Sequence, residues 1–386
     1  ISGYVGNPIY NLATLYNNTD PSVKDKIIIK TSYPGTSVNY DENGNNATDS
    51  INNMTSIYKN FTNWKNNVAQ NMVADEPLQN AIDQFSKNMT DVDKKYFAYE
   101  VSTYVGNEYG ADPIDLSWKY FDKIGYRVGG DNDSVTDKVF INGFYDIITG
   151  LVNDVKPNNI RYHMVVSSIN YNDNGVIVTT ANNTVYYGEY VINTIPPWNM
   201  NPELFSPPIP EKKSEAIDKM SHGTLAQTYL YSTKGVFWGD KDWLNYVPPL
   251  NEKGRFTTFE NMDKVNGFPM LFAFNYGTYA NQLFSMNNKD LKKDLFRALS
   301  HMYPQRVSNS STDKDPGKIH FDDIVVVYRG ENETFSIVPV NFKVPDDFDL
   351  LASPLVDSNG KNRVFFAGEA TTWHYPETTH GAYLTG

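Results

Sequence analysis

The chain has 386 residues, and 40% of them are hydrophobic, which is enough to build two domains with cores of their own. A formal net charge of -12 argues against nucleic acid or an anionic membrane as a partner and favours a cationic ligand. With no cysteine, and six histidines outside any HExxH pairing, the sequence excludes disulfides and cysteine nucleophiles, and no metal site is expected.

Residues 50–125 are predicted to be mainly helical. Apolar side chains recur there at helical spacing, at Ile51, Met54, Ile57, Tyr58 and Phe61. Asn-rich loops interrupt the helices, and aromatic residues that keep recurring indicate that the whole stretch is folded.

Residues 161–195 are predicted to form a sheet. A strand over 162–171 meets the hairpin turn Asn174-Gly175, and strands over 176–178 and 184–187 follow. The apolar run 190–195 is a short buried strand that Pro196-Pro197 ends. The pattern predicts a three-stranded meander feeding a core strand.

The last third of the chain mixes strands with helices. Strands are expected over 269–274 and 363–367, an amphipathic helix over 289–302 and a solvated loop over 307–318. A late strand that returns to an early sheet indicates an α/β domain interleaved with an α+β domain.

The residues after the last strand carry the clearest chemical signal. Gly368 allows a tight turn, and Glu369 follows at the carboxyl end of the strand, where α/β sheets bind ligands. Thr378 and Thr379 are suited to cap a helix that begins near His380. Such a helix start favours a group that gains negative charge, although an ordinary capped C-terminal helix explains the same residues equally well.

The stretch 364–386, VFFAGEATTWHYPETTHGAYLTG, resembles the C-terminal FAD signature of the flavin amine oxidases. Residues 378–382, TTHGA, match the form found in spermine and N-acetylpolyamine oxidases. The resemblance implies that Glu369 contacts the ribityl and pyrophosphate part of FAD. It also implies that the backbone of Thr378 and Thr379 meets the flavin ring.

Weaker matches follow in the family's order along nearly the whole chain. Residues 165–169 and 190–196 resemble the segment in which a valine backbone holds the adenine, a role that would fall to Val166. Further similar segments are 6–10, 108–117, 138–144 and 334–340. The resemblance implies a Rossmann-like α/β FAD-binding domain over 1–49, 136–199 and 346–386. An α+β substrate-binding domain would then comprise 50–135 and 200–345.

Three departures from the family pattern stand out. The strand–GxGxxG–helix segment that cradles the pyrophosphate is absent, so the chain is expected to begin inside the FAD-binding domain and to hold FAD poorly alone. Gln227 stands where the family has a lysine near flavin N5; it can hold a water but supplies no cation. The loop aromatic of the family is replaced by Val338, or by Ile337 in a shifted alignment.

The resemblance implies oxidation of an amine, with a polyamine favoured, to an imine and then an aldehyde, while oxygen becomes hydrogen peroxide. Gln227 would occupy the catalytic position, and Glu108 would pair with a substrate ammonium, unless it is a solvated surface acid. One alternative is an L-amino-acid oxidase, which would use Arg329 or Arg255 for the substrate carboxylate. The other is a catalytically impaired protein that binds a small ligand.

Compartment and assembly have little support in the sequence. Sequons begin at nine asparagines and favour a secreted or extracytoplasmic glycoprotein over a cytoplasmic protein. They are Asn17, Asn46, Asn53, Asn60, Asn88, Asn132, Asn182, Asn309 and Asn332. No apolar run reaches the roughly 18 residues of a membrane-spanning helix. Nothing in the sequence indicates an oligomeric state.

Overall fold

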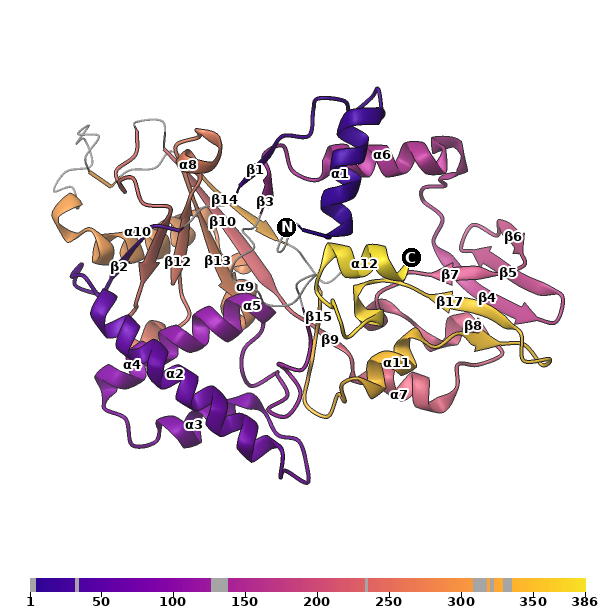
Figure 1. Cartoon of the computed structure of the whole chain (residues 1–386), viewed down its shortest axis with the longest axis horizontal. Helices are drawn as coiled ribbons and strands as arrows, with labels where there is room; N and C mark the ends of the chain where they lie inside the picture. The colour runs from indigo at the N-terminus through magenta and orange to yellow at the C-terminus, as the bar shows by residue number, and fades with distance from the viewer. Residues whose placement is uncertain are drawn as a thin grey trace. The chain divides into compact units, whose positions relative to one another are not determined.

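The computed structural model describes residues 5–31, 35–125, 138–232, 235–307, 318–319, 323–328 and 335–386. The chain divides into two compact units (Figure 1). The first comprises Ile1–Ser32, Tyr120–Ser221 and Phe335–Gly386, and the second comprises Tyr33–Lys119 and His222–Thr334. Compared with the boundaries expected from the sequence, residues 33–49 lie in the second unit, and residues 120–135, 200–221 and 335–345 lie in the first.

The first unit consists of short strands and helices. Its helices are α1 (Pro8–Thr19), α6 (Tyr145–Val155), α7 (Glu211–Lys219), α11 (Asp346–Ala352) and α12 (Thr379–Thr385), with 3₁₀ turns η2 (Pro157–Asn159), η3 (Pro197–Asn199), η4 (Pro202–Leu204) and η7 (Glu369–Thr371). Its strands are β1 (Ile29–Thr31), β3 (Lys138–Phe140), β4 (Val166–Asn172), β5 (Gly175–Thr180), β6 (Val185–Gly188), β7 (Val191–Asn193), β8 (Phe205–Ser206), β15 (Ser336–Ile337), β16 (Leu355–Val356) and β17 (Asn362–Phe366). Strand β9 (Ser221–His222) lies where the chain passes into the second unit.

The predicted meander is confirmed. Strands β4, β5 and β6 pair antiparallel in sequence order, and the chain then enters β7. The first strand begins at Val166, later than expected, because the φ of 59° at His163 is incompatible with the extended backbone of a strand. Strand β7 pairs in parallel with β17, as the late strand returning to an early sheet requires.

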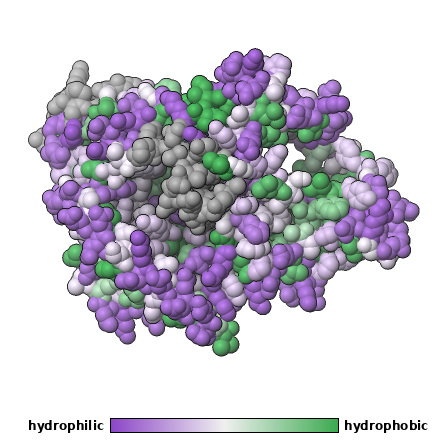
Figure 2. All heavy atoms as spheres, in the orientation of Figure 1, coloured by the Kyte–Doolittle hydropathy of each residue, from purple (hydrophilic) through white to green (hydrophobic). Residues whose placement is uncertain are grey.

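One edge of this parallel pair is open among the described strands, where the sheet order is β16-β17-β7. Ile192 of β7 and Phe365 of the middle strand β17 are paired neighbours on one face of this sheet, and they are 58% and 37% exposed. Figure 2 shows hydrophobic atoms at the surface over β7 and β17. Parallel strands of this kind are normally covered on both faces.

The second unit is a mixed sheet with helices. Its strands are β2 (Ser37–Tyr40), β10 (Leu225–Tyr231), β11 (Trp243–Tyr246), β12 (Thr258–Asn261), β13 (Met270–Tyr276) and β14 (Asp323–Tyr328). Its helices are α2 (Thr48–Ala69), α3 (Leu78–Ser86), α4 (Asp91–Val101), the π-helix η1 (Ser102–Gly106), α5 (Asn107–Tyr109), α8 (Met262–Asn266), α9 (Gly277–Ser285) and α10 (Asn288–Met302), with 3₁₀ turns η5 (Leu250–Glu252) and η6 (Pro304–Arg306). The helical content expected for 50–125 and the expected helix 289–302 are confirmed.

The sheet order of the second unit is β14-β10-β13-β12-β11-β2. One face packs on α9 and α10, where Leu230, Leu271, Leu283 and Leu295 belong to a single buried cluster. Because side chains alternate along a strand, Gln227 and its alternate neighbours on β10 point to the opposite face. Figure 1 shows α2 and α4 packed together beside this sheet.

Lys213 of α7 holds the end of α11 in the first unit. Its buried Nζ donates to the carbonyl oxygens of Leu350, Leu351 and Ser353 at 2.8, 2.6 and 2.8 Å. The Leu350 carbonyl also accepts hydrogen bonds from the N–H and the hydroxyl of Ser353, at 3.3 and 2.6 Å. Carbonyls at the end of a helix carry partial negative charge, which the lysine ammonium complements. Because Lys213→Met removes one buried donor from each of three carbonyl oxygens, we expect the free energy of unfolding to fall by about 3 kcal/mol. Urea unfolding measures this loss.

The matched control is Lys219→Met on the same helix. Lys219 is 35% exposed and lies 3.5 Å from Asp347, so its removal is expected to cost less than about 1 kcal/mol. An equal loss of unfolding free energy in the two variants would show that the hydrogen bonds of Lys213 to the three carbonyls add nothing beyond its charge and packing.

Candidate active site

Glu369 lies at the carboxyl end of β17, in the turn that follows Gly368. Its carboxylate accepts hydrogen bonds from the backbone N–H and the hydroxyl of Ser336, at 3.1 and 2.6 Å. It also accepts one from the N–H of Glu377 at 2.7 Å. Burial raises the pKa of Glu369, although these hydrogen bonds favour the charged form. The carboxylate thus ties two loops to the end of the strand.

Gly368 leaves open space beside this carboxylate. Its φ of 136° is a conformation that other residues rarely adopt, and a Cβ added there would meet no atom within 4 Å. A bare backbone at the carboxyl end of a parallel strand is the usual place for a nucleotide cofactor in an α/β sheet. The open space beside Gly368 therefore allows a flavin dinucleotide to lie against the backbone at this point.

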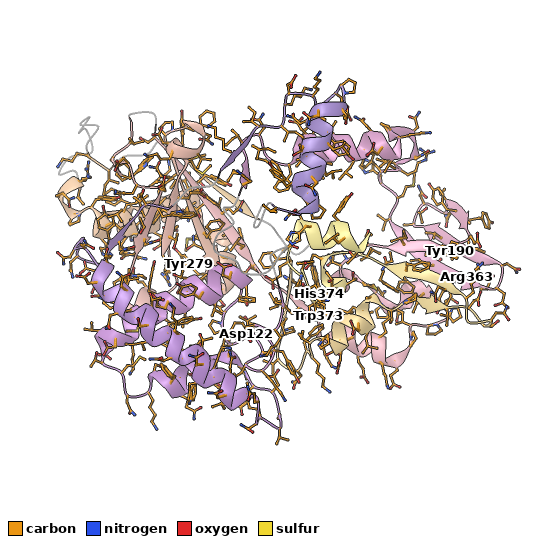
Figure 3. All side chains as sticks on the ribbon, in the orientation of Figure 1. Asp122, Tyr190, Tyr279, Arg363, Trp373 and His374 are labelled. Atoms are coloured by element: carbon orange, nitrogen blue, oxygen red, sulfur yellow. The ribbon has the colours of Figure 1, made fainter. Side chains whose placement is uncertain are left out.

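The start of α12 has the cap that the sequence predicts. The hydroxyl of Thr378 accepts from the N–H of Gly381 at 2.9 Å and donates to the carbonyl of Tyr375 at 2.8 Å. Thr379 is the first helical residue. A Cβ on Gly381 would lie 1.9 Å from the Tyr375 oxygen, so only glycine fits this turn. Figure 3 labels Trp373 and His374, whose rings stack ahead of the helix.

Val166 is the first residue of β4 and lies half-buried opposite Thr180. The ladder is irregular between Val166 and Ser168, and bulges of this kind often adjoin ligand sites. The side chain of the preceding Val165 is 70% exposed. The role of the Val166 backbone at the adenine stays a prediction.

The segment that contains Ser336 has aliphatic residues where the family has an aromatic one. Ile337 and Val338, the residues that replace the family's aromatic, are 2% and 0% exposed. Ser336 belongs to the segment 334–340 that resembles the family's loop beside the flavin, but its two hydrogen bonds to Glu369 were not predicted. A serine 33 positions before its partner carries no local signal of this contact.

In the second unit, Gln227 lies half-buried on β10 directly opposite Phe274 of β13. Its side-chain oxygen is 3.4 Å from the hydroxyl of Tyr229, which donates to it. The ring of Tyr229 stacks on Phe272 with centroids 4.7 Å apart. Gln227 therefore belongs to an aromatic face of the sheet, and its catalytic role stays a prediction.

Two other predicted residues have different surroundings. Glu108 is exposed on the short helix α5, and its pairing with a substrate ammonium stays a prediction. Arg255 is half-buried with its guanidinium 4.8 Å from the ring centre of Tyr279, so an aromatic ring already faces this cation. Arg329 lies outside the described residues.

A cavity of about 700 Å³ opens within the second unit. It lies between α3, α4 and the end of β13, and its walls include Phe97, Val101, Asp112, Tyr276 and Tyr279. Neither Gln227 nor Glu108 is among the described residues that line it. This cavity is therefore a separate feature of the unit.

Two kinds of feature are absent from the described part of the chain. No helix there is both long and apolar enough to cross a membrane. Nor do the described ranges contain a group of three or more His, Cys, Asp or Glu side chains that could hold a metal ion.

The end of β17 has the features of an α/β protein that binds a nucleotide cofactor beside a buried carboxylate. The chain belongs to the flavin containing amine oxidoreductase family, whose family model matches residues 44–386. Its cofactor is accordingly FAD, and the family acts on amines. The expected FAD and the expected amine oxidase family are confirmed.

Curated relatives have more specific names. The chain is 29% identical over 343 residues to lysine-specific histone demethylase 1 homolog 1 of Arabidopsis thaliana, covering 83% of this chain and 36% of the relative. Identity to protein FLOWERING LOCUS D of the same plant is 33% over 237 residues, covering 59% and 28%. Human lysine-specific histone demethylase 2 is 26% identical over 238 residues, covering 59% and 27%. The chain thus spans about a third of the length of these relatives.

Proposed function

We propose that this protein oxidises an amine with FAD, and that a polyamine is its substrate. The family membership supports amine oxidation, and the buried Glu369 beside the open space at Gly368 is the observation that carries the cofactor assignment. The net charge of -12 supports a polycationic substrate, because an acidic protein concentrates cations around itself.

The end of β17 and the start of α12 would hold FAD, which would supply the oxidising chemistry: acceptance of a hydride from the carbon beside a neutral amine, and return of both electrons to oxygen as hydrogen peroxide. The residues of the chain itself bind the cofactor and the substrate and orient them. Glu369 fixes the loop of Ser336 and the turn before Thr378 in one arrangement, so the cofactor meets a preformed backbone. Gln227 would hold a water by its side-chain amide, as the family resemblance implies, and water hydrolyses the imine to an aldehyde.

A second candidate substrate is a methylated lysine side chain. The names of the relatives from Arabidopsis thaliana and Homo sapiens, lysine-specific histone demethylases, favour it. An N-methylated lysine and a polyamine share the reacting group, a secondary or tertiary amine on an alkyl chain. They differ in what lies beyond it, which is a peptide in one case and further ammonium groups in the other.

Hydrogen peroxide release from the holoprotein distinguishes the candidates. The panel contains spermine, N-acetylspermine, a peptide with a dimethylated lysine, and L-leucine. Our proposal predicts turnover with spermine or its acetylated form and none with L-leucine. Turnover of the peptide alone would replace the polyamine by methylated lysine, and turnover of L-leucine alone would establish the amino-acid oxidase alternative. Binding of spermine without turnover of any amine would establish the ligand-binding alternative.

A further inference from the structure

The sheet face that carries Gln227 also carries a row of side chains set directly opposite one another on neighbouring strands. The row runs from Trp243 on β11 through Glu260 on β12 and Phe272 on β13 to Tyr229 on β10. Directly opposite side chains have Cβ atoms roughly 5 Å apart. In this row the Glu260 carboxylate therefore has an aromatic residue on each side.

Among the residues that the structure describes, none forms an ion pair with Glu260. Within the described ranges its half-buried carboxylate makes no hydrogen bond or ion pair. The nearby Asp242, by contrast, accepts hydrogen bonds from the N–H and the hydroxyl of Thr36 at 3.0 and 2.6 Å. Burial, and then the charge of Asp242, raise the pKa of Glu260. A carboxylate held in this way gains stability when a cation arrives from outside.

We propose that Glu260 binds an ammonium group of the substrate between the side chains of Trp243 and Phe272. The inference rests on the proposed amine oxidation and makes its substrate class more definite. The rings beside the carboxylate contribute as well, because the face of an aromatic ring attracts a cation. Glu260 thus selects a cationic substrate and takes no part in the bond-breaking step.

The position of Glu260 relative to Gln227 indicates how the substrate is arranged. Glu260 is opposite Phe272 and Gln227 is opposite Phe274, so the two lie on either side of β13 and two residues apart along it. Strand spacings of about 4.8 Å and a rise of about 3.4 Å per residue put their Cα atoms about 12 Å apart. A substrate that reacts at Gln227 reaches Glu260 only with a second nitrogen farther along its chain. The face therefore favours an extended polyamine over a monoamine.

Binding by calorimetry tests this proposal on the holoprotein, without any need for turnover. The ligands are spermine, with several ammonium groups, and N-methylhexylamine, with one. Replacing the carboxylate in Glu260→Gln removes a charge-assisted contact, so we expect the Kd of spermine to rise at least about tenfold. The Kd of N-methylhexylamine is expected to change less than about twofold, because its single nitrogen lies at the reacting position.

Two further variants separate recognition from structure and from general charge. Glu260→Asp keeps the carboxylate and is expected to bind spermine more tightly than Glu260→Gln does. Glu76→Gln removes an exposed carboxylate elsewhere in the same unit and is expected to leave both affinities within about twofold. Unfolding temperatures of the variants, measured alongside, show whether each protein is folded.

The outcomes decide the two proposals separately. An unchanged Kd of spermine in Glu260→Gln would overturn the role of Glu260, as would an equal loss for both ligands. Failure of the wild-type holoprotein to bind spermine at all would overturn it too. If spermine binds through Glu260 but the flavin never becomes reduced by any amine, the proposed oxidation fails and the binding role of Glu260 stands.

Discussion

Replacing Glu369 with alanine is expected to weaken FAD binding by about a hundredfold, because three buried donors lose their acceptor together. These donors are the N–H and hydroxyl of Ser336 and the N–H of Glu377. Without the carboxylate, the two loops beside Gly368 are no longer held in a single arrangement. Titration of FAD into the deflavinated protein, followed by flavin fluorescence, measures the change.

Two companion variants sharpen this result. Glu369→Gln keeps the shape and one acceptor oxygen, so its loss of FAD affinity is expected to lie between those of the wild type and Glu369→Ala. Glu203→Ala removes an exposed carboxylate from the same unit and is expected to leave the affinity unchanged. If Glu369→Ala bound FAD as tightly as the wild type, Glu369 would have no role in holding the cofactor.

Replacing Gln227 with lysine is expected to speed reoxidation of the reduced flavin by oxygen about tenfold or more. Gln227 stands where the family resemblance places a lysine near flavin N5. A lysine cation stabilises the negative charge that oxygen gains as it takes an electron, and glutamine supplies no such charge. Stopped-flow mixing of the reduced holoprotein with oxygenated buffer measures the rate.

The control for this variant is Tyr231→Lys, which adds the same charge on the same sheet face four residues farther along β10. Its effect on reoxidation is expected to be much smaller, because screening weakens the interaction over that distance. Equal acceleration in both variants would mean that net charge, and not the position of Gln227, governs the reaction with oxygen. An unchanged reoxidation rate in Gln227→Lys would contradict the assignment of Gln227 to the position near flavin N5.

Local patterns were enough to predict most individual elements. The hairpin turn at Asn174-Gly175 and the apolar runs around Ile192 and Phe365 were enough to predict strands. The expected full burial of these two runs was wrong, because Ile192 and Phe365 are 58% and 37% exposed. The spacing of Leu291, Leu295 and Leu299 gave helix α10. Long-range pairings were not predicted, because nothing local in residues 37–40 or 323–328 shows that both strands join the sheet of β10.

In the candidate site, too, features that depend on neighbouring residues were predicted and features that depend on long-range contacts were not. The cap at Thr378 and the carboxylate of Glu369 follow one another within a short signature, so the sequence predicted both. Ser336 reaches Glu369 only through the fold. Glu260 was missed for another reason: a single glutamate between Phe259 and Asn261 has the alternation of an outward-facing strand position. Only the pairing of four strands shows that its outward face is aromatic.

The central claim is that an amine reduces the FAD of the holoprotein, and anaerobic mixing of the holoprotein with spermine tests it most directly. Our account predicts that the visible absorbance of oxidised flavin disappears, with one aldehyde formed per flavin. Flavin that stays oxidised with spermine, and with every other amine of the panel, would contradict the account.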